Sequence, residues 1–186
     1  MDRKPFRILA VAGSLRQGSY NRGLLRAAQE VAPDWVEVWF FDIGQLPFFN
    51  EDVEAAGDPE PVRRFKDAIA TSNAVLIATP EYNGAVPGVL ANALDWASRP
   101  TGRSVLRNKP VAIMGAVKGK SGSANAQAAL RGVPFTSRFF IEPPPEPHER
   151  WSWCSSFWEP RAWLATVPAR SAPPSIHHLE SASRRW

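Results

Sequence analysis

The chain has 186 residues, of which 44% are hydrophobic and 22% charged, and its formal net charge is +4. This size and composition predict one globular domain with a full hydrophobic core, and the modest charge, without any block of five basic residues, does not favour a nucleic-acid partner. We also expect no membrane partner and a cytoplasmic location, because no apolar run approaches the roughly 18 residues of a membrane span or forms a signal-peptide core.

Apolar runs of strand length alternate with stretches of helical periodicity along most of the chain. The apolar or β-branched runs predict strands over residues 7–13, 35–42, 73–80 and 109–117. Apolar residues at helical spacing predict helices over residues 22–31, 88–98 and 123–133. A further helix is expected to begin at Pro59 and Pro61, where prolines cost least, after a loop containing "GQLPFFNED".

Strands that alternate with amphipathic helices indicate right-handed crossover units. The fold class predicted is therefore α/β, with a doubly wound parallel sheet in three layers, helix, sheet and helix. A fifth strand over Ser137–Pro143 would complete a five-stranded, flavodoxin-like sheet of strand order 2-1-3-4-5.

The composition changes after Val133. This last part has no glycine, yet it holds nine of the 18 prolines, five of the eight tryptophans and all three histidines. We therefore divide the chain into a flavodoxin-like domain over 1–142 and an atypical Pro/Trp-rich tail over 143–186. The tail is either a proline-rich extension that docks through its tryptophans or a departure from the ancestral reading frame. Its histidines and Cys154 lack metal-ligand spacing, so no metal is expected.

The loop "GSLRQGSYN" follows the first predicted strand. Gly13 permits a tight turn, and Ser14, Ser19 and Asn21 offer polar side chains beside backbone N–H groups that enter a helix. Arg16 adds a guanidinium group suited to phosphate oxygens. The loop could hold an anion, or it could be an ordinary turn in which Ser19 or Asn21 caps the helix.

Two nucleotide-binding motifs are excluded. The dinucleotide fingerprint G-x-G-x-x-G is absent from the first loop. The later segment "GAVKGKSGS" resembles a phosphate-binding Walker motif, but it has three intervening residues where that motif has four, and it follows the fourth strand. Neither a bound dinucleotide pyrophosphate nor triphosphate hydrolysis is therefore expected.

The loops after the third and fourth strands suggest the other end of a ligand. "TPEYNGAVP" combines prolines and a glycine with Tyr82, Glu81 and Asn83, which can hold a flat heteroaromatic ring, although "YNG" is also a plain turn signal. The glycine-rich loop that begins at Gly115 permits close backbone approach. The carboxyl ends of neighbouring parallel strands meet at one edge of a sheet, so one ligand could contact all three loops. Such a ligand would have a phosphate at one end and a flat heteroaromatic ring at the other, which describes a phosphorylated flavin.

The segments "VAGSLRQGSYN", "TPEYNGAVPGVLANALDWASRP" and "KPVAIMGA" resemble the NADPH-dependent FMN reductase family of flavodoxin-like flavoproteins, which includes chromate, quinone and azo-dye reductases. The resemblance covers residues 6–133. It departs from the family at Val117, where serine is common, and at Ala91, where lysine is frequent. The FMN-binding residues it implies are Ser14, Leu15, Arg16, Ser19, Asn21, Pro80, Glu81, Tyr82, Asn83, Gly84, Gly115 and Ala116.

The resemblance further implies an NAD(P)H oxidoreductase. NADPH or NADH would pass a hydride to N5 of the flavin, and a flavin, quinone, chromate or azo-type acceptor would then take the electrons, with no catalytic side chain. A homodimer or homotetramer is implied, with Leu94–Pro100 in the segment that contributes to the interface. The alternatives are a flavodoxin-like FMN-binding electron carrier, or an inactive interaction protein with an altered tail.

Overall fold

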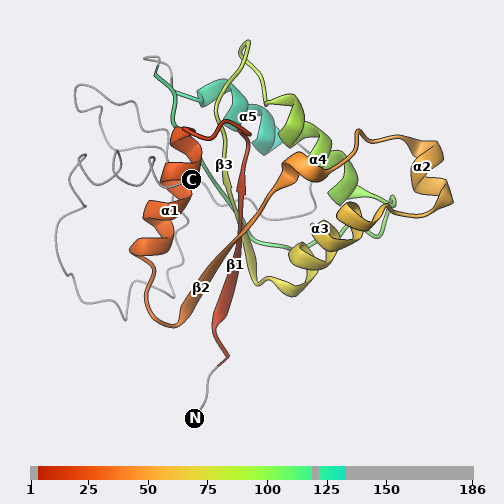
Figure 1. Cartoon of the computed structure of the whole chain (residues 1–186), viewed down its shortest axis with the longest axis horizontal. Coiled ribbons are helices and arrows are strands. Elements are labelled where there is room, and N and C mark those ends of the chain that lie inside the picture. The colour runs from red at the N-terminus through yellow and green to blue at the C-terminus, as the bar shows by residue number, and fades with distance from the viewer. Residues whose placement is uncertain (1–3, 119–121, 133–186) are drawn as a thin grey trace.

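The computed structural model describes residues 4–118 and 122–132, and they form a parallel sheet between helices (Figure 1). The sheet has four strands in the order β2-β1-β3-β4. The strands are β1 (Phe6–Ala12), β2 (Val36–Phe41), β3 (Ala74–Ala78) and β4 (Val111–Met114). The predicted α/β class and the order of these strands are confirmed, whereas the predicted fifth strand, Ser137–Pro143, and the tail lie outside the described residues.

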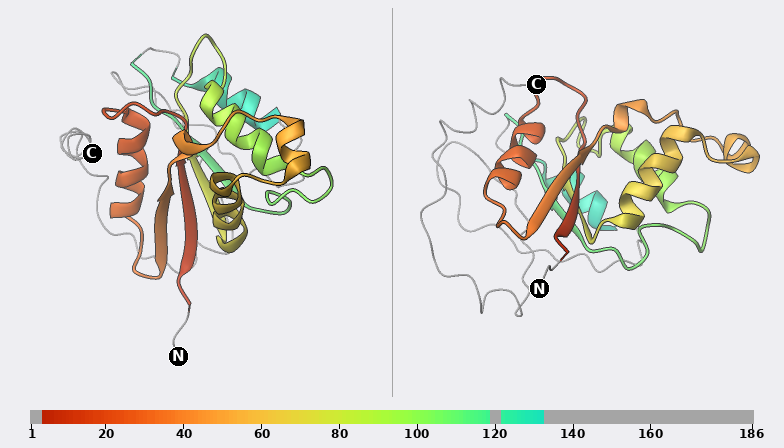
Figure 2. Two further views of the ribbon diagram at one scale, coloured as in Figure 1. Left: turned by 45° about the vertical axis from the view of Figure 1, so that its right-hand side comes forward. Right: turned by 60° about the horizontal axis from the view of Figure 1, so that its bottom comes forward.

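Helices lie on both faces of the sheet (Figures 1 and 2). The helix α1 lies on one face, and α3 and α4 lie on the other, with α5 beside α4. The α-helices are α1 (Tyr20–Glu30), α2 (Glu51–Ala56), α3 (Glu60–Thr71), α4 (Gly88–Ser98) and α5 (Ala124–Gly132). All four predicted helices are present, and the expected layers of helix, sheet and helix are confirmed.

The two faces of the sheet have separate cores, because successive side chains of a strand point to opposite sides. On β1, Leu9 and Val11 belong to the larger cluster, which also contains residues of α3, α4 and α5. Ala10 of the same strand packs with Leu25 of α1 in the smaller cluster. This alternation within apolar strands is what a sheet covered on both faces requires.

The segment between β2 and α3 differs from its expectation as a loop. It contains a short 3-10 helix, η1 (Ile43–Gln45), and the six-residue helix α2. Asp42 and Asn50 cap these helices by accepting hydrogen bonds from Gly44 N–H and Asp52 N–H, at 3.0 and 2.8 Å. Six residues are too few to show a helical periodicity, so the only sequence signal for α2 is its capping residue.

The same segment is bound to one face of α4. Asn92 and Trp96 both donate hydrogen bonds to the carbonyl oxygen of Pro47, each at 2.9 Å. The indole of Trp96 is fully buried and packs edge-on against the ring of Phe49. Because Trp96 is enclosed within its own chain, the segment 94–100 could reach a partner only through its other side chains.

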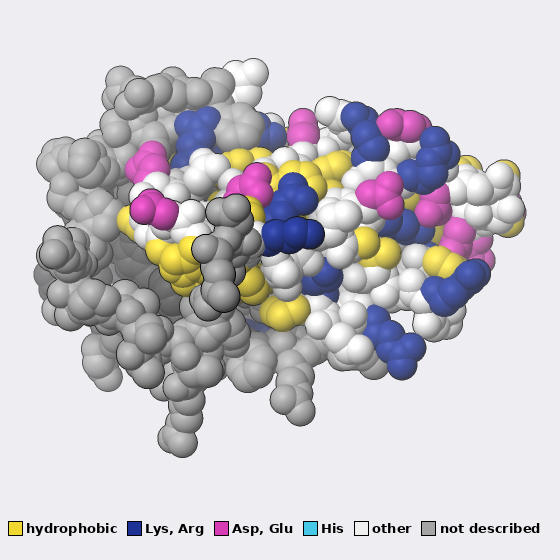
Figure 3. Space-filling model, turned by 90° about the horizontal axis from the view of Figure 1, so that it is seen from below, with side chains coloured by type: hydrophobic (Ala, Val, Ile, Leu, Met, Phe, Trp, Pro, Cys, Tyr) yellow, Lys and Arg dark blue, Asp and Glu magenta, His cyan; other side chains and the backbone are white. Residues whose placement is uncertain are grey.

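Charges of both signs are interspersed on the surface. In the view from below, Lys and Arg side chains alternate with Asp and Glu side chains over the right-hand part of the molecule (Figure 3). Some of these form ion pairs, such as Arg64 with Glu60 at 3.0 Å. Within the described part of the chain, none of the helices has the length and apolar character needed to span a bilayer.

Candidate functional site

The loops after β1, β3 and β4 begin at the same edge of the sheet. Beyond the strands, Gly13 N–H donates to the carbonyl oxygen of Ala78 at 2.8 Å, and Thr79 N–H donates to that of Met114 at 2.9 Å. These bonds continue the hydrogen bonding between the strands by one residue pair, so the three loops leave the sheet side by side. Three segments far apart in the sequence are thereby brought into contact at the carboxyl edge, where open parallel sheets bind ligands.

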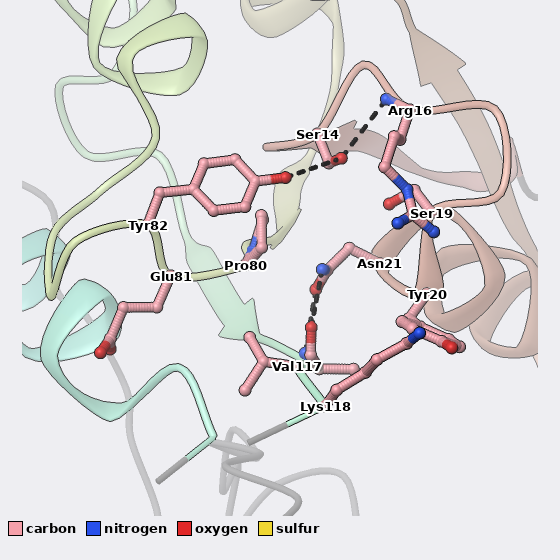
Figure 4. A pocket seen from close by; sticks show the side chains of 11 residues that line it. Ser14, Arg16, Ser19, Tyr20, Asn21, Pro80, Glu81, Tyr82, Val117 and Lys118 are labelled. Carbon is pink, nitrogen blue, oxygen red and sulfur yellow. Dashed lines mark hydrogen bonds between the residues drawn. The ribbon is translucent and has the colours of Figure 1, made fainter.

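A pocket lies between these loops (Figure 4). The space between these loops amounts to about 480 Å³ and is open to solvent. The residues that line it are Ser14, Arg16, Ser19, Tyr20, Asn21, Pro80, Glu81, Tyr82, Ala116, Val117 and Lys118.

The first loop presents hydroxyl and N–H groups at the start of α1. Ser19 is the N-cap of α1, and its Oγ accepts a hydrogen bond from Arg22 N–H at 3.4 Å. The first turn of α1 contains no acidic residue, so the positive end of the helix dipole is not compensated from within the helix. The guanidinium of Arg16 is folded back on its own loop, where Nη2 donates to the carbonyl oxygen of Gly18 at 2.6 Å.

Asn21 joins the first loop to the third. Its Nδ2 donates to the carbonyl oxygen of Ala116 at 2.9 Å, and its Oδ1 accepts from the N–H of the same residue at 3.0 Å. The side chain is only 2% exposed. Since both polar ends of the amide are occupied by backbone groups, Asn21 shapes the pocket wall by holding Ala116 in place.

The second loop contains a tight hairpin turn. Tyr82 and Ala85 exchange two backbone hydrogen bonds at 3.2 and 3.0 Å, and Asn83 and Gly84 between them both have positive φ angles, of 53° and 70°. Positive φ at both central positions defines a type I′ turn, which favours the dipeptide Asn-Gly. The turn presents the half-exposed ring of Tyr82 to the pocket, with its hydroxyl 3.5 Å from Oγ of Ser14.

The carboxylate of Glu81 is bound to the start of α5. It accepts hydrogen bonds from the side-chain amide of Asn125 at 3.1 Å and from the N–H of Ala126 at 3.0 Å. In Figure 4 the side chain points toward α5 and away from Tyr82. Glu81 therefore anchors the base of the hairpin to a helix N-terminus, where a negative charge is stabilising.

Replacing Glu81 should loosen this anchor. We expect Glu81→Ala to lower the free energy of unfolding by about 1–2 kcal/mol, because a helix N-terminus loses its cap and charge, and Glu81→Gln, which keeps one acceptor, to lower it by less. Urea unfolding measures both. The control is Glu37→Ala, which breaks the exposed ion pair with Arg7 and should cost at most about 0.5 kcal/mol. Equal losses in Glu81→Ala and the control would contradict the anchoring role.

The structure brings most of the expected ligand-binding residues together. Eight of them line the pocket, namely Ser14, Arg16, Ser19, Asn21, Pro80, Glu81, Tyr82 and Ala116. The remaining four do not line it. Leu15 lies against Gly44. Asn83 and Gly84 form the tip of the hairpin, and Gly115 lies against Ser123.

Three further residues, Tyr20, Val117 and Lys118, line the pocket although they are not among the FMN-binding residues that the resemblance implies. Tyr20 lies within the first loop motif, between two predicted residues. Val117 and Lys118 belong to the glycine-rich segment after β4, whose spacing excludes a Walker motif but whose position at the carboxyl edge still brings it to the ligand. Position along the sheet was the signal that could have identified all three.

Two titratable groups with shifted pKa values lie outside the pocket. Burial raises the pKa of Asp95 and lowers that of Lys109, and neither residue lines the pocket. Residues 4–118 and 122–132 contain no cluster of three or more His, Cys, Asp or Glu side chains placed to hold a metal ion.

Comparisons with known proteins point to one enzyme family. A family model described as NADPH-dependent FMN reductase matches residues 6–146. The chain is 50% identical over 127 residues to a 2-hydroxy-1,4-benzoquinone reductase of a Burkholderia species, covering 68% of this chain and 69% of that protein. It is 46% identical over 126 residues to a quinone reductase of Pseudomonas putida, covering 68% of each chain.

Solved structures agree with this result. The flavoenzyme NAD(P)H:(acceptor) oxidoreductase FerB from Paracoccus denitrificans superimposes with a TM-score of 0.70 at 38% identity, over 77% of this chain and 80% of that one. An azoreductase from Bacillus anthracis has a TM-score of 0.51 at 16% identity, over 71% and 82% of the two chains, which is a likeness of fold alone.

Proposed function

The chain belongs to the NADPH-dependent FMN reductase family, and we propose that it is an FMN-dependent NAD(P)H oxidoreductase that reduces quinones. In the overall reaction, NAD(P)H and a proton convert a quinone to a hydroquinone. The single observation that carries the proposal is the meeting of three loops, after β1, β3 and β4, around one polar pocket at the carboxyl edge of a flavodoxin-like sheet.

The pocket residues suit the two chemically different ends of FMN. One wall offers the hydroxyls of Ser14 and Ser19, the start of α1 and the cationic side chain of Arg16, which together suit a phosphate. The opposite wall offers Pro80 and the half-exposed ring of Tyr82, which suit a flat heteroaromatic ring. We infer that these residues hold the cofactor.

The protein's own contribution is binding and orientation. When bound, FMN supplies the redox chemistry by accepting a hydride from NADPH or NADH and passing electrons to the acceptor. Asn21 keeps the backbone of Ala116 at the pocket wall, and the Ser14 hydroxyl beside the Tyr82 hydroxyl connects the phosphate wall to the hairpin. We assign no general acid or base, because the carboxylate of Glu81 is already bound to α5.

Quinones are the acceptors that we propose, since relatives at 50% and 46% identity are named for quinone reduction. Flavin, chromate and azo-type acceptors remain hypotheses to be compared with quinones in the same assay. We also propose that the protein is a cytoplasmic homodimer or homotetramer.

Steady-state assay of the FMN-loaded protein tests the proposed function. We expect NADPH or NADH to be oxidised when 1,4-benzoquinone is added, with ping-pong kinetics. A protein that binds FMN but oxidises neither NADPH nor NADH would instead be an electron carrier. A folded protein that does not bind FMN would contradict both functions.

A further inference from the structure

The pocket contains a second cation that the family resemblance does not supply. Lys118, on the loop after β4, lines the pocket together with Arg16, on the loop after β1. The ammonium nitrogen of Lys118 lies 5.9 Å from the centre of the Tyr20 ring, and Tyr20 is the first residue of α1. In Figure 4, Ser19, Tyr20 and Asn21 lie between Arg16 and Lys118. Both cations therefore line the pocket near the start of α1.

This positive charge is not neutralised by nearby carboxylates. Neither Arg16 nor Lys118 forms a salt bridge with the acidic residues of the described chain, and the first turn of α1 contains no acidic residue. Glu81 lines the same pocket, but its carboxylate is bound to Asn125 and Ala126 at the start of α5. Two cations and the positive end of a helix dipole repel one another unless an anion lies between them.

We propose that Lys118 is a specificity-determining residue that binds the phosphate of the flavin together with Arg16, and that it makes the protein prefer FMN to riboflavin. This inference rests on the proposed function, since it concerns the same site. The phosphate is close to a dianion at neutral pH, so two cations match its charge better than one. Lysine suits this role because its ammonium is a compact point charge on a flexible stem.

The experiment compares the affinities of the apoprotein for FMN and for riboflavin, which lacks the phosphate. We expect Lys118→Met to raise the Kd for FMN about fivefold and to leave the Kd for riboflavin unchanged, because only the phosphate carries charge. Added salt should raise the Kd for FMN less in this variant than in the wild type. Lys118→Arg, which keeps the charge, should bind FMN almost as tightly as the wild type.

The matched control is Lys4→Met. Lys4 is exposed and precedes β1, at the end of the sheet opposite the pocket, so this variant should bind both flavins normally. An unchanged Kd for FMN in Lys118→Met would overturn the inference, as would an equal rise in the Kd for both flavins. Wild-type protein that binds neither flavin would overturn the proposed function, and the role of Lys118 with it.

Discussion

Replacing Gly115 with alanine should destabilise the protein more than any other single methyl group added near the site. Gly115 is the first residue after β4, and a Cβ atom there would overlap Oγ of Ser123 and the carbonyl oxygen of Thr79. The Thr79 carbonyl is backbone and cannot rotate away. Ser123 is fully buried, and its Oγ accepts a hydrogen bond from Gln127 at 3.0 Å, so moving it breaks a buried contact.

We expect Gly115→Ala to lower the free energy of unfolding by about 2–3 kcal/mol, through overpacking and the lost hydrogen bond. The midpoint of thermal unfolding should fall by about 4–12 °C. The loops after β3 and β4 must separate to admit the methyl group, so FMN affinity should fall as well. Circular dichroism during heating and a flavin titration measure the two effects.

The control for this prediction is Gly88→Ala. A Cβ atom at Gly88 would meet open space, and Gly88 is the first residue of α4, where alanine favours the helix. Gly88→Ala should therefore be as stable as the wild type, or more stable by up to about 1 kcal/mol. If Gly115→Ala were as stable as the wild type, the close approach of the loops after β3 and β4 would not be required for stability.

The second large effect is expected at Asn21. In Asn21→Asp, one carboxylate oxygen can still accept from Ala116 N–H, but the other replaces the amide that donates to the Ala116 carbonyl. The buried carboxylate would then face a carbonyl oxygen without a proton between them. We expect the free energy of unfolding to fall by about 2–4 kcal/mol. FMN affinity should fall at least about tenfold, since the added negative charge lies beside the phosphate wall.

Asn50→Asp is the matched control. Asn50 caps the short helix α2, and aspartate accepts the same hydrogen bond from Asp52 N–H. Its stability should therefore stay within about 0.5 kcal/mol of the wild type. If urea unfolding and flavin titration gave wild-type values for Asn21→Asp, the tie between the first and third loops would have no role in the site.

The sequence predicts the fold and the general position of the site well. Apolar runs over residues 7–13 and 73–80 predict strands buried on both faces, and parallel pairing then brings their carboxyl ends together. Residue types in the loops, such as the arginine at position 16 and the Asn-Gly pair after Tyr82, predict the chemistry of each wall. These inferences need only local periodicity and the geometry of parallel sheets.

Long-range partners are not predictable in the same way. Asn21 and Ala116 are 95 positions apart, and Glu81 and Asn125 are 44 apart. Whether a polar side chain binds a ligand or a distant backbone group depends on tertiary contacts that no local pattern contains. The resemblance assigned Asn21 and Glu81 to the cofactor. In the structure both line the pocket, and the side-chain polar groups of both also hold loops in place.

A flavin titration of the purified protein tests the central claim most directly, namely that the loops after β1, β3 and β4 form an FMN site. We expect a yellow equimolar complex with FMN, and weaker binding of riboflavin because riboflavin has no phosphate for the phosphate wall to bind. Folded protein that binds neither flavin, or that binds riboflavin as tightly as FMN, would contradict it.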